Sequence, residues 1–315
     1  MKVRKYIFYG ALSAALILLA AAIVIYPERY VQSTLTGILL WAECVLPSLF
    51  PFMVITLIFT KTGIADKASL PLKRVCTFFK LPPAASVCLI MSLVSGYPAG
   101  SKLVAEFCER GYIDKDGAKK LTCLCSTSGP LFIIGSVGYK MFGDKIIGLK
   151  LFLAHALSVT VIALIISLLS KKNQTPYVKT AINGDNALYD SFYSAAISVI
   201  VAGGFIAFFY TVSQIAVDFR ILNPLKTLLA TFFNPDVSEA VCKGLIEVTT
   251  GCRSLSKISS PYAAPLAGFL ITFGGISIIL QQLCYLTKAG VSSVKFIIIK
   301  FIQAIACFLI LLPMV

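Results

Sequence analysis

The sequence predicts an all-α polytopic membrane protein in which two inverted structural repeats contain re-entrant or broken helices, with about seven to nine membrane segments. Of its 315 residues, 58% are hydrophobic and only 13% are charged, whereas a soluble domain carries about a quarter charged residues. Long uncharged runs recur along the chain, and Lys and Arg gather between them. The net charge of +14 is explained by loops beside anionic lipid, and no basic patch with interleaved aromatics indicates nucleic-acid binding.

The first elements are an N-terminal span and a second, kinked span. Residues 6–26 are uncharged, and Tyr26-Pro27-Glu28-Arg29 is typical of the interface end of a retained helix, not of a cleaved signal peptide. Residues 30–60 carry one charge, Glu43, and contain Pro47 and Pro51, which we expect to kink the helix. Further uncharged runs lie at 81–101, 121–139 and 151–170.

A polar stretch then separates the two halves. The sequence predicts an N-terminal transmembrane helix at 1–30, a first membrane repeat at 31–170, a cytoplasmic linker at 171–190 and a second membrane repeat at 191–315. The second repeat contains an apolar run at 191–217, a weaker region to Lys257, a run at 258–287 and a last run from Phe296 that Lys300 interrupts.

The positions of the basic residues predict the topology. Lys and Arg at 2–5, 61–80 and 171–179 mark cytoplasmic segments. If 121–139 leads outward and 151–170 returns, 81–101 must enter and leave on the cytoplasmic side. Ser95-Gly96-Tyr97-Pro98-Ala99-Gly100 interrupts this run with two Gly and a Pro, as in a re-entrant or broken helix that lines protein or a water-filled cavity.

The sequence predicts that the second half repeats the first. Ser95-Gly96-Tyr97-Pro98-Ala99-Gly100-Ser101-Lys102 aligns with Thr250-Gly251-Cys252-Arg253-Ser254-Leu255-Ser256-Lys257, and Gly129-Pro130-Leu131 aligns with Gly268-Phe269-Leu270. Because the linker starts the second half on the opposite side, the repeats are predicted to be inverted, as in many secondary transporters.

These breaks supply the candidate binding residues. Helix starts at a break present unpaired N–H groups and a positive dipole end, which favour anions. The candidate solute-binding residues are Ser95, Gly96, Tyr97, Gly100, Ser101, Lys102, Ser126, Thr127, Ser128, Gly129, Thr250, Gly251, Arg253 and Lys257. A packing kink with capping hydroxyls is the alternative for the first two breaks, and interface anchoring is the alternative for the basic residues.

Two acidic residues, Glu43 and Glu247, are the candidates for coupling to a proton or cation; ion pairing and an interfacial position remain the alternatives. Gln281 and Gln282 are candidate cavity residues, and the only histidine, His155, is interpreted as a packed, bundle-facing residue. No nucleophile–base pair, metal-ligand cluster or cofactor motif occurs, so we expect neither an enzyme nor a metal site.

Three motifs carry a family resemblance. Leu46-Pro47-Ser48-Leu49-Phe50-Pro51-Phe52, Ser95-Gly96-Tyr97-Pro98-Ala99-Gly100-Ser101-Lys102 and Ser126-Thr127-Ser128-Gly129-Pro130-Leu131-Phe132 resemble the sporulation integral membrane proteins of the YlbJ type, within the wider nucleoside-recognition or gate-domain membrane proteins. This resemblance implies an endospore-forming source and a role in moving dipicolinic acid from mother cell to forespore.

The sequence and the resemblance together favour a transporter of a small organic anion, with solute bound between two helix breaks. The expected partners are that anion and the lipid bilayer. The sequence does not decide whether the protein forms a homo-oligomer. The expected location is the cytoplasmic membrane, with the outer forespore membrane as a more specific expectation. The alternatives are a non-transporting assembly protein for spore envelope formation and a transporter of a nucleoside-like or lipid-linked solute.

Overall fold

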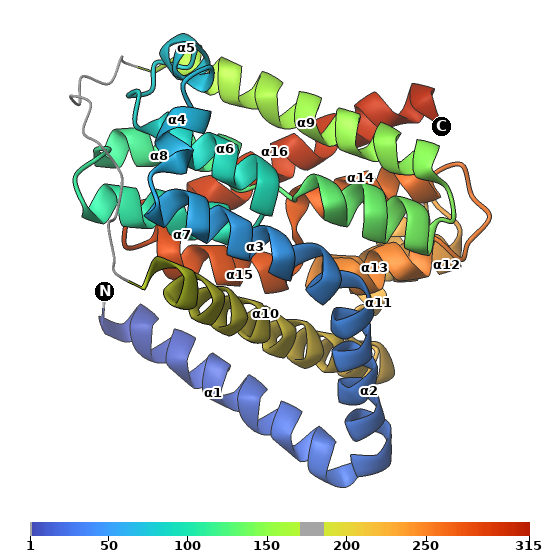
Figure 1. Cartoon of the computed structure of the whole chain (residues 1–315). Coiled ribbons are helices and arrows are strands. Elements are labelled where there is room, and N and C mark those ends of the chain that lie inside the picture. Colours follow the sequence, from blue (N-terminus) through green and yellow to red (C-terminus); the bar gives the residue numbers. More distant parts are fainter. Residues whose placement is uncertain (1, 171–185) are drawn as a thin grey trace.

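The computed structural model describes residues 2–170 and 186–315, which form helices joined by short connections (Figure 1). The all-α prediction is confirmed for these residues. The first half contains α1 (Lys2–Ile25), α2 (Pro27–Leu40), π-helix η1 (Trp41–Val45), α3 (Leu46–Lys61), α4 (Ile64–Ala68), α5 (Leu72–Phe78), α6 (Ala85–Ser95), α7 (Ala99–Glu109), α8 (Lys115–Cys125), π-helix η2 (Leu131–Met141) and α9 (Lys145–Leu168). The second half contains α10 (Ala187–Asp218), α11 (Asn223–Leu229), α12 (Pro235–Ile246), α13 (Val248–Leu255), α14 (Ala263–Phe273), α15 (Gly275–Leu286), α16 (Ser293–Leu311) and 3-10 helix η3 (Leu312–Met314).

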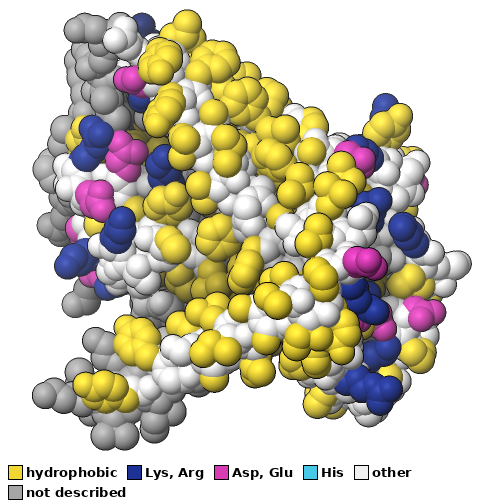
Figure 2. All heavy atoms as spheres, turned by 90° about the horizontal axis from the view of Figure 1, so that it is seen from below, with side chains coloured by type: hydrophobic (Ala, Val, Ile, Leu, Met, Phe, Trp, Pro, Cys, Tyr) yellow, Lys and Arg dark blue, Asp and Glu magenta, His cyan; other side chains and the backbone are white. Residues whose placement is uncertain are grey.

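The outer surface is that of a membrane protein. Figure 2 shows a broad band of apolar side chains, with Lys, Arg, Asp and Glu gathered at the two ends of the molecule. Large exposed apolar side chains lie on α1, α9, α10 and α16, the helices that face outward. Five helical segments in the described part of the chain are long and apolar enough to cross a bilayer. The predicted multi-pass membrane protein is therefore confirmed.

The second span bends at η1, immediately before the prolines that predict a kink (Figure 1). Pro47 has no N–H to donate to the carbonyl of Glu43, four residues earlier. Lys140 Nζ instead donates to that carbonyl at 2.7 Å, and the hydroxyl of Ser136 donates to the carbonyl of Cys44. Side chains of η2 therefore satisfy the backbone that the bend exposes, as a membrane interior requires.

The predicted re-entrant segment is a hairpin of α6 and α7. Each helix has 11 residues and is therefore about 16 Å long, roughly half of the hydrocarbon core. The two helices pack against each other, and both pack against α8. After a break at 126–130, η2 continues the path of α8, and α9 packs along both of them. The segment 115–141 thus forms a broken helix.

The second half contains a comparable hairpin, α12 and α13, and a comparable broken helix, α14 and α15. The sequence alignment misplaces both breaks. The hairpin turns at Glu247, and Thr250 and Gly251 already lie inside α13, because the Glu247 side chain caps that helix. Gly268 lies inside α14, and the second broken helix is interrupted instead at Gly274 and Gly275, which have φ values of 94° and 65°.

The broken helix of the second half forms the centre of the molecule. In the apolar 18-residue window of Ala263–Leu286, 83% of the residues are buried, whereas only 33–39% are buried in the corresponding windows of the other long apolar segments. The predicted linker falls largely on 171–185, outside the described residues, and α10 begins at Ala187, before the predicted repeat boundary.

Candidate functional site

The two breaks of the first half touch each other. Gly96 has φ 69° and ψ −165°, a conformation that only glycine adopts readily. A Cβ at Gly96 would lie 2.3 Å from the backbone N of Gly129. The hairpin turn and the broken helix therefore meet backbone to backbone, and glycine at 96 permits this contact.

A chain of buried polar groups surrounds this contact. Ser101 Oγ lies 3.1 Å from Ser126 Oγ and donates to Gln282 Oε1 at 2.8 Å. The Ser126 carbonyl, at the end of α8, accepts a hydrogen bond from Lys300 Nζ at 2.7 Å. Gln303 Nε2 donates to the carbonyl of Cys123 at 2.9 Å. Side chains of α16 thus donate hydrogen bonds to the backbone carbonyls at the end of α8.

His155 connects the same break to the second half. Its Nε2 accepts a hydrogen bond from the backbone N–H of Ser128 at 3.3 Å, and its Nδ1 lies 2.9 Å from Thr272 Oγ1. Because Nε2 accepts, we assign the proton of the neutral ring to Nδ1, which donates to Thr272. His155 is buried, as the interpretation of a packed histidine expects, and it also holds a helix break.

At the hairpin of the second half, Glu247 is fully buried and caps α13. Its carboxylate accepts hydrogen bonds from the N–H groups of Thr249 and Thr250 at 3.1 and 2.7 Å, and from the Thr250 hydroxyl at 2.7 Å. The negative charge lies at the positive end of the helix dipole. Glu43, in contrast, has a side chain that is 54% exposed and lies 3.9 Å from Lys140.

Breaks of both halves line one small cavity. Tyr97, Ser128 and Gly129 face it from the first half, and Thr249 and Gln281 face it from the second. Its volume is about 20 Å³, which holds no more than a water molecule. A neighbouring cavity of about 80 Å³ shares Pro98 and Gln281 with it and is also lined by Lys102. An organic solute at the breaks would therefore require the two halves to separate.

The remaining candidate residues differ in their surroundings. Ser95 donates to the Met91 carbonyl at 2.7 Å within α6, and Gly100 permits the contact of α7 with the carbonyl of Cys125. Thr127 is buried and lines a cavity of about 150 Å³ beside His155. Arg253 is half-buried in the last turn of α13, and Lys257 is exposed beyond its end. Neither lines the cavities between the breaks.

Lys300 contacts the first break but is absent from the candidate residues. It is 1% exposed, yet its ammonium contacts a helix break. The sequence does contain a signal for it, because Lys300 is a single charge inside an apolar run, and a charge within a span is commonly functional.

A curated relative supports the family resemblance. The chain is 25% identical to the "Sporulation integral membrane protein YlbJ" of Bacillus subtilis (strain 168). The alignment is 317 residues long with gaps included, and it covers 91% of this chain and 78% of that protein. The predicted similarity to YlbJ-type sporulation membrane proteins is confirmed. No protein-family model matches the chain, and no solved structure matches it. The similarity to YlbJ supports a membrane role in sporulation.

Proposed function

We propose that this YlbJ relative transports a small organic anion across the membrane, with the solute bound where the helix breaks of the two halves meet. The observation that carries the proposal is the cavity between Tyr97, Ser128, Thr249 and Gln281, because both halves contribute a break to it. Helix starts at such breaks present N–H groups to an anion, and transporters commonly place their sites there.

The order of the elements supports an alternating-access mechanism. In each half a long helix is followed by a hairpin, a broken helix and a final long helix: α2–α3, α6–α7, α8–η2 and α9, then α10, α12–α13, α14–α15 and α16. The two hairpins lie at opposite ends of the molecule (Figure 1). We propose that the halves are inverted repeats that rock against each other, opening the central cavity to one side at a time.

Dipicolinate is the solute to test first. The family resemblance implies it, and it is a small, planar, aromatic dicarboxylate that suits helix starts and basic side chains. The similarity to a sporulation protein gives the same biological setting. The chemistry of the breaks suits other small carboxylates equally, so the test includes several.

The experiment is uptake of labelled dipicolinate by proteoliposomes, beside other carboxylates and nucleosides. Ser128→Ala and Thr249→Ala remove hydroxyls at the cavity and are expected to lower uptake about tenfold each, the effect of one lost hydrogen bond of about 1.4 kcal/mol. Thr77→Ala, an exposed threonine on α5, is the matched control and should transport normally. Folded protein that takes up none of these solutes would refute transport and favour an assembly role.

A further inference from the structure

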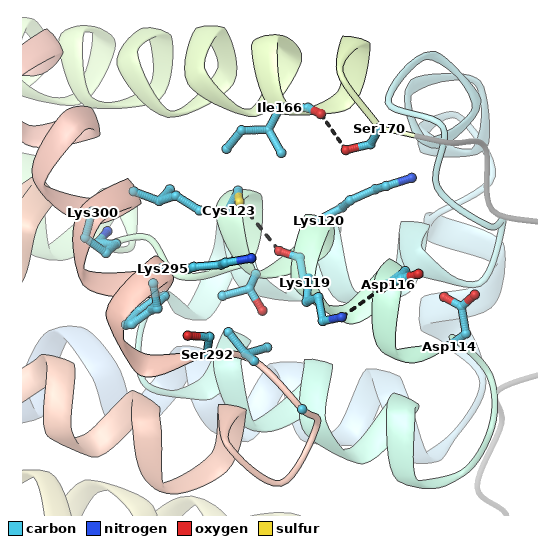
Figure 3. A pocket seen from close by; sticks show the side chains of 15 residues that line it. Asp114, Asp116, Lys119, Lys120, Cys123, Ile166, Ser170, Ser292, Lys295 and Lys300 are labelled. Carbon is cyan, nitrogen blue, oxygen red and sulfur yellow. Dashed lines mark hydrogen bonds and ion pairs between the residues drawn. The ribbon is translucent and has the colours of Figure 1, made fainter.

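A large cavity lies at the end of the molecule that carries the loops predicted to be cytoplasmic. Its volume is about 840 Å³, and it lies between α8 and α16, beside the end of α9 (Figure 3). Pockets that bind small ligands typically have volumes of about 300–1,000 Å³. This cavity is large enough for an organic solute, whereas the cavity between the breaks is not.

Positive charge dominates the lining. Lys119, Lys120, Lys295 and Lys300 line the cavity, against the two acidic residues Asp114 and Asp116 at its rim. Lys119 donates to Asp116 at 2.8 Å, which lowers the pKa of that carboxyl and neutralises one lysine. Asp114 caps α8 by accepting from the N–H of Gly117 at 2.6 Å. Both acids are therefore engaged on α8, away from α16.

The two lysines of α16 have no such compensation. Among the residues whose side chains the structure describes, neither Lys295 nor Lys300 forms an ion pair. Lys295 projects into the cavity in Figure 3. Lys300 is 1% exposed, and the Ser126 carbonyl is its hydrogen-bond acceptor among these residues. An ammonium has three donors, and a buried charge without a counter-ion is costly.

We propose that this cavity is a binding site for a small dicarboxylate, with Lys300 at its inner end and Lys295 nearer its mouth. The two lysines are five residues apart on one helix, which corresponds to a rise of about 7.5 Å. Two cations that line one cavity match a ligand with two anionic groups better than a monoanion. The bound dianion supplies the negative counter-charge for Lys300 that the described side chains do not supply.

The position of Lys300 connects this site to the proposed transport path. Its ammonium contacts the broken helix at Ser126, and the Ser126 hydroxyl lies 3.1 Å from Ser101 on the re-entrant hairpin. In this proposal the cavity is an initial binding site on the cytoplasmic side, from which the solute moves to the central site at the breaks. This role rests on the proposed function, whereas binding to the cavity does not.

The test is equilibrium binding of labelled isophthalate, with benzoate as its monocarboxylate counterpart, to purified protein in nanodiscs of zwitterionic lipid. Isophthalate is expected to bind at least tenfold more tightly than benzoate. Lys300→Gln is expected to weaken isophthalate binding about 30-fold or more, since it removes a buried charge partner. Lys295→Gln is expected to weaken it about fivefold, as for a more exposed charge.

Lys288→Gln is the matched control, because Lys288 is an exposed lysine in the connection before α16 and does not line the cavity. Its binding should be unchanged. Lys295→Gln keeps the test valid if Lys300→Gln fails to fold. Equal binding by wild type and both cavity variants overturns the proposal, and so does equal affinity for isophthalate and benzoate.

Anionic lipid in the nanodiscs separates a solute site from a lipid-headgroup site. Isophthalate affinity should be unchanged by added phosphatidylglycerol; competition by the lipid would overturn the proposal in favour of a headgroup site. Lysine-dependent binding without uptake into vesicles would leave the site standing and refute transport. Uptake that does not change in Lys295→Gln and Lys300→Gln would refute the role of the cavity in transport and leave transport itself standing.

Discussion

Gly96→Ala tests the contact between the two breaks, on which the proposed site depends. The substitution has two costs. Alanine at φ 69° and ψ −165° is strained by about 1–3 kcal/mol. Its Cβ would also lie 2.3 Å from the N and 2.9 Å from the Cα of Gly129, and overpacking against backbone costs about another 1–3 kcal/mol. Together these costs predict a fall in melting temperature on the order of 10 °C.

A thiol-reactive dye measures this unfolding, because cysteines such as Cys88, Cys125 and Cys252 are buried in the folded protein. Gly204→Ala is the matched control. Gly204 is an exposed glycine of α10, and a Cβ there would meet nothing within 4 Å. The control should melt at or above the wild-type temperature, because alanine favours a helix over glycine by about 1 kcal/mol. If Gly96→Ala melts like Gly204→Ala, the breaks do not meet as described.

Three further predictions address coupling, topology and the break at Ser128. Glu247→Gln should remove the pH dependence of uptake, while Glu43→Gln should leave it intact, because Glu43 is exposed beside Lys140; an unchanged profile for Glu247→Gln would exclude coupling there. In a cysteine-free background, Glu109→Cys should react with an impermeant maleimide from the cytoplasm and Lys257→Cys from outside, and labelling of both from one side would refute inversion. His155→Ala should lower the unfolding free energy by about 1–3 kcal/mol, since it leaves the Ser128 N–H unsatisfied; a melting temperature equal to that of wild type would contradict this role.

The breaks of the first half were predictable because they contain glycine and proline, the residues that most often interrupt helices. Gly96 and Pro98 interrupt an apolar run, and Gly129 and Pro130 interrupt the next. The distribution of Lys and Arg then requires the first of these runs to return to its own side. Local composition located both breaks and the helix hairpin between residues 85 and 109, and the re-entrant topology stays a prediction.

The second hairpin was misplaced because its turn contains no glycine or proline. Its defining residue is Glu247, whose carboxylate caps α13. The alignment paired the small residues Ser95 and Gly96 with the small residues Thr250 and Gly251, and it therefore placed the turn too late in the sequence. Gly251 serves a different purpose, because a Cβ there would lie 2.3 Å from the Cα of Gly244 on the opposite arm of the hairpin.

The hydrogen-bond partners of Lys300 could not be predicted from the sequence, although its position as a charge within an apolar run could be seen there. The hydrogen bond from Lys300 to Ser126 joins residues 174 positions apart. The bond from Ser101 to Gln282 spans 181 positions. Neither pair has a local signal, because both depend on how α7 and α8 pack against α15 and α16.

The two buried charges indicate where an anion can bind at the breaks. Lys300 lies at the carbonyl end of α8, and Glu247 lies at the N-terminal end of α13, so each charge compensates a helix dipole of opposite sign. With Glu247 in place, the start of α13 is closed to an anionic solute. The starts of α7 and η2 have no side-chain cap and border the cavity at Tyr97 and Ser128. A solute carboxylate is therefore expected at the breaks of the first half, and protonation of Glu247 would weaken its hold on α13 and open the third helix start to the same anion.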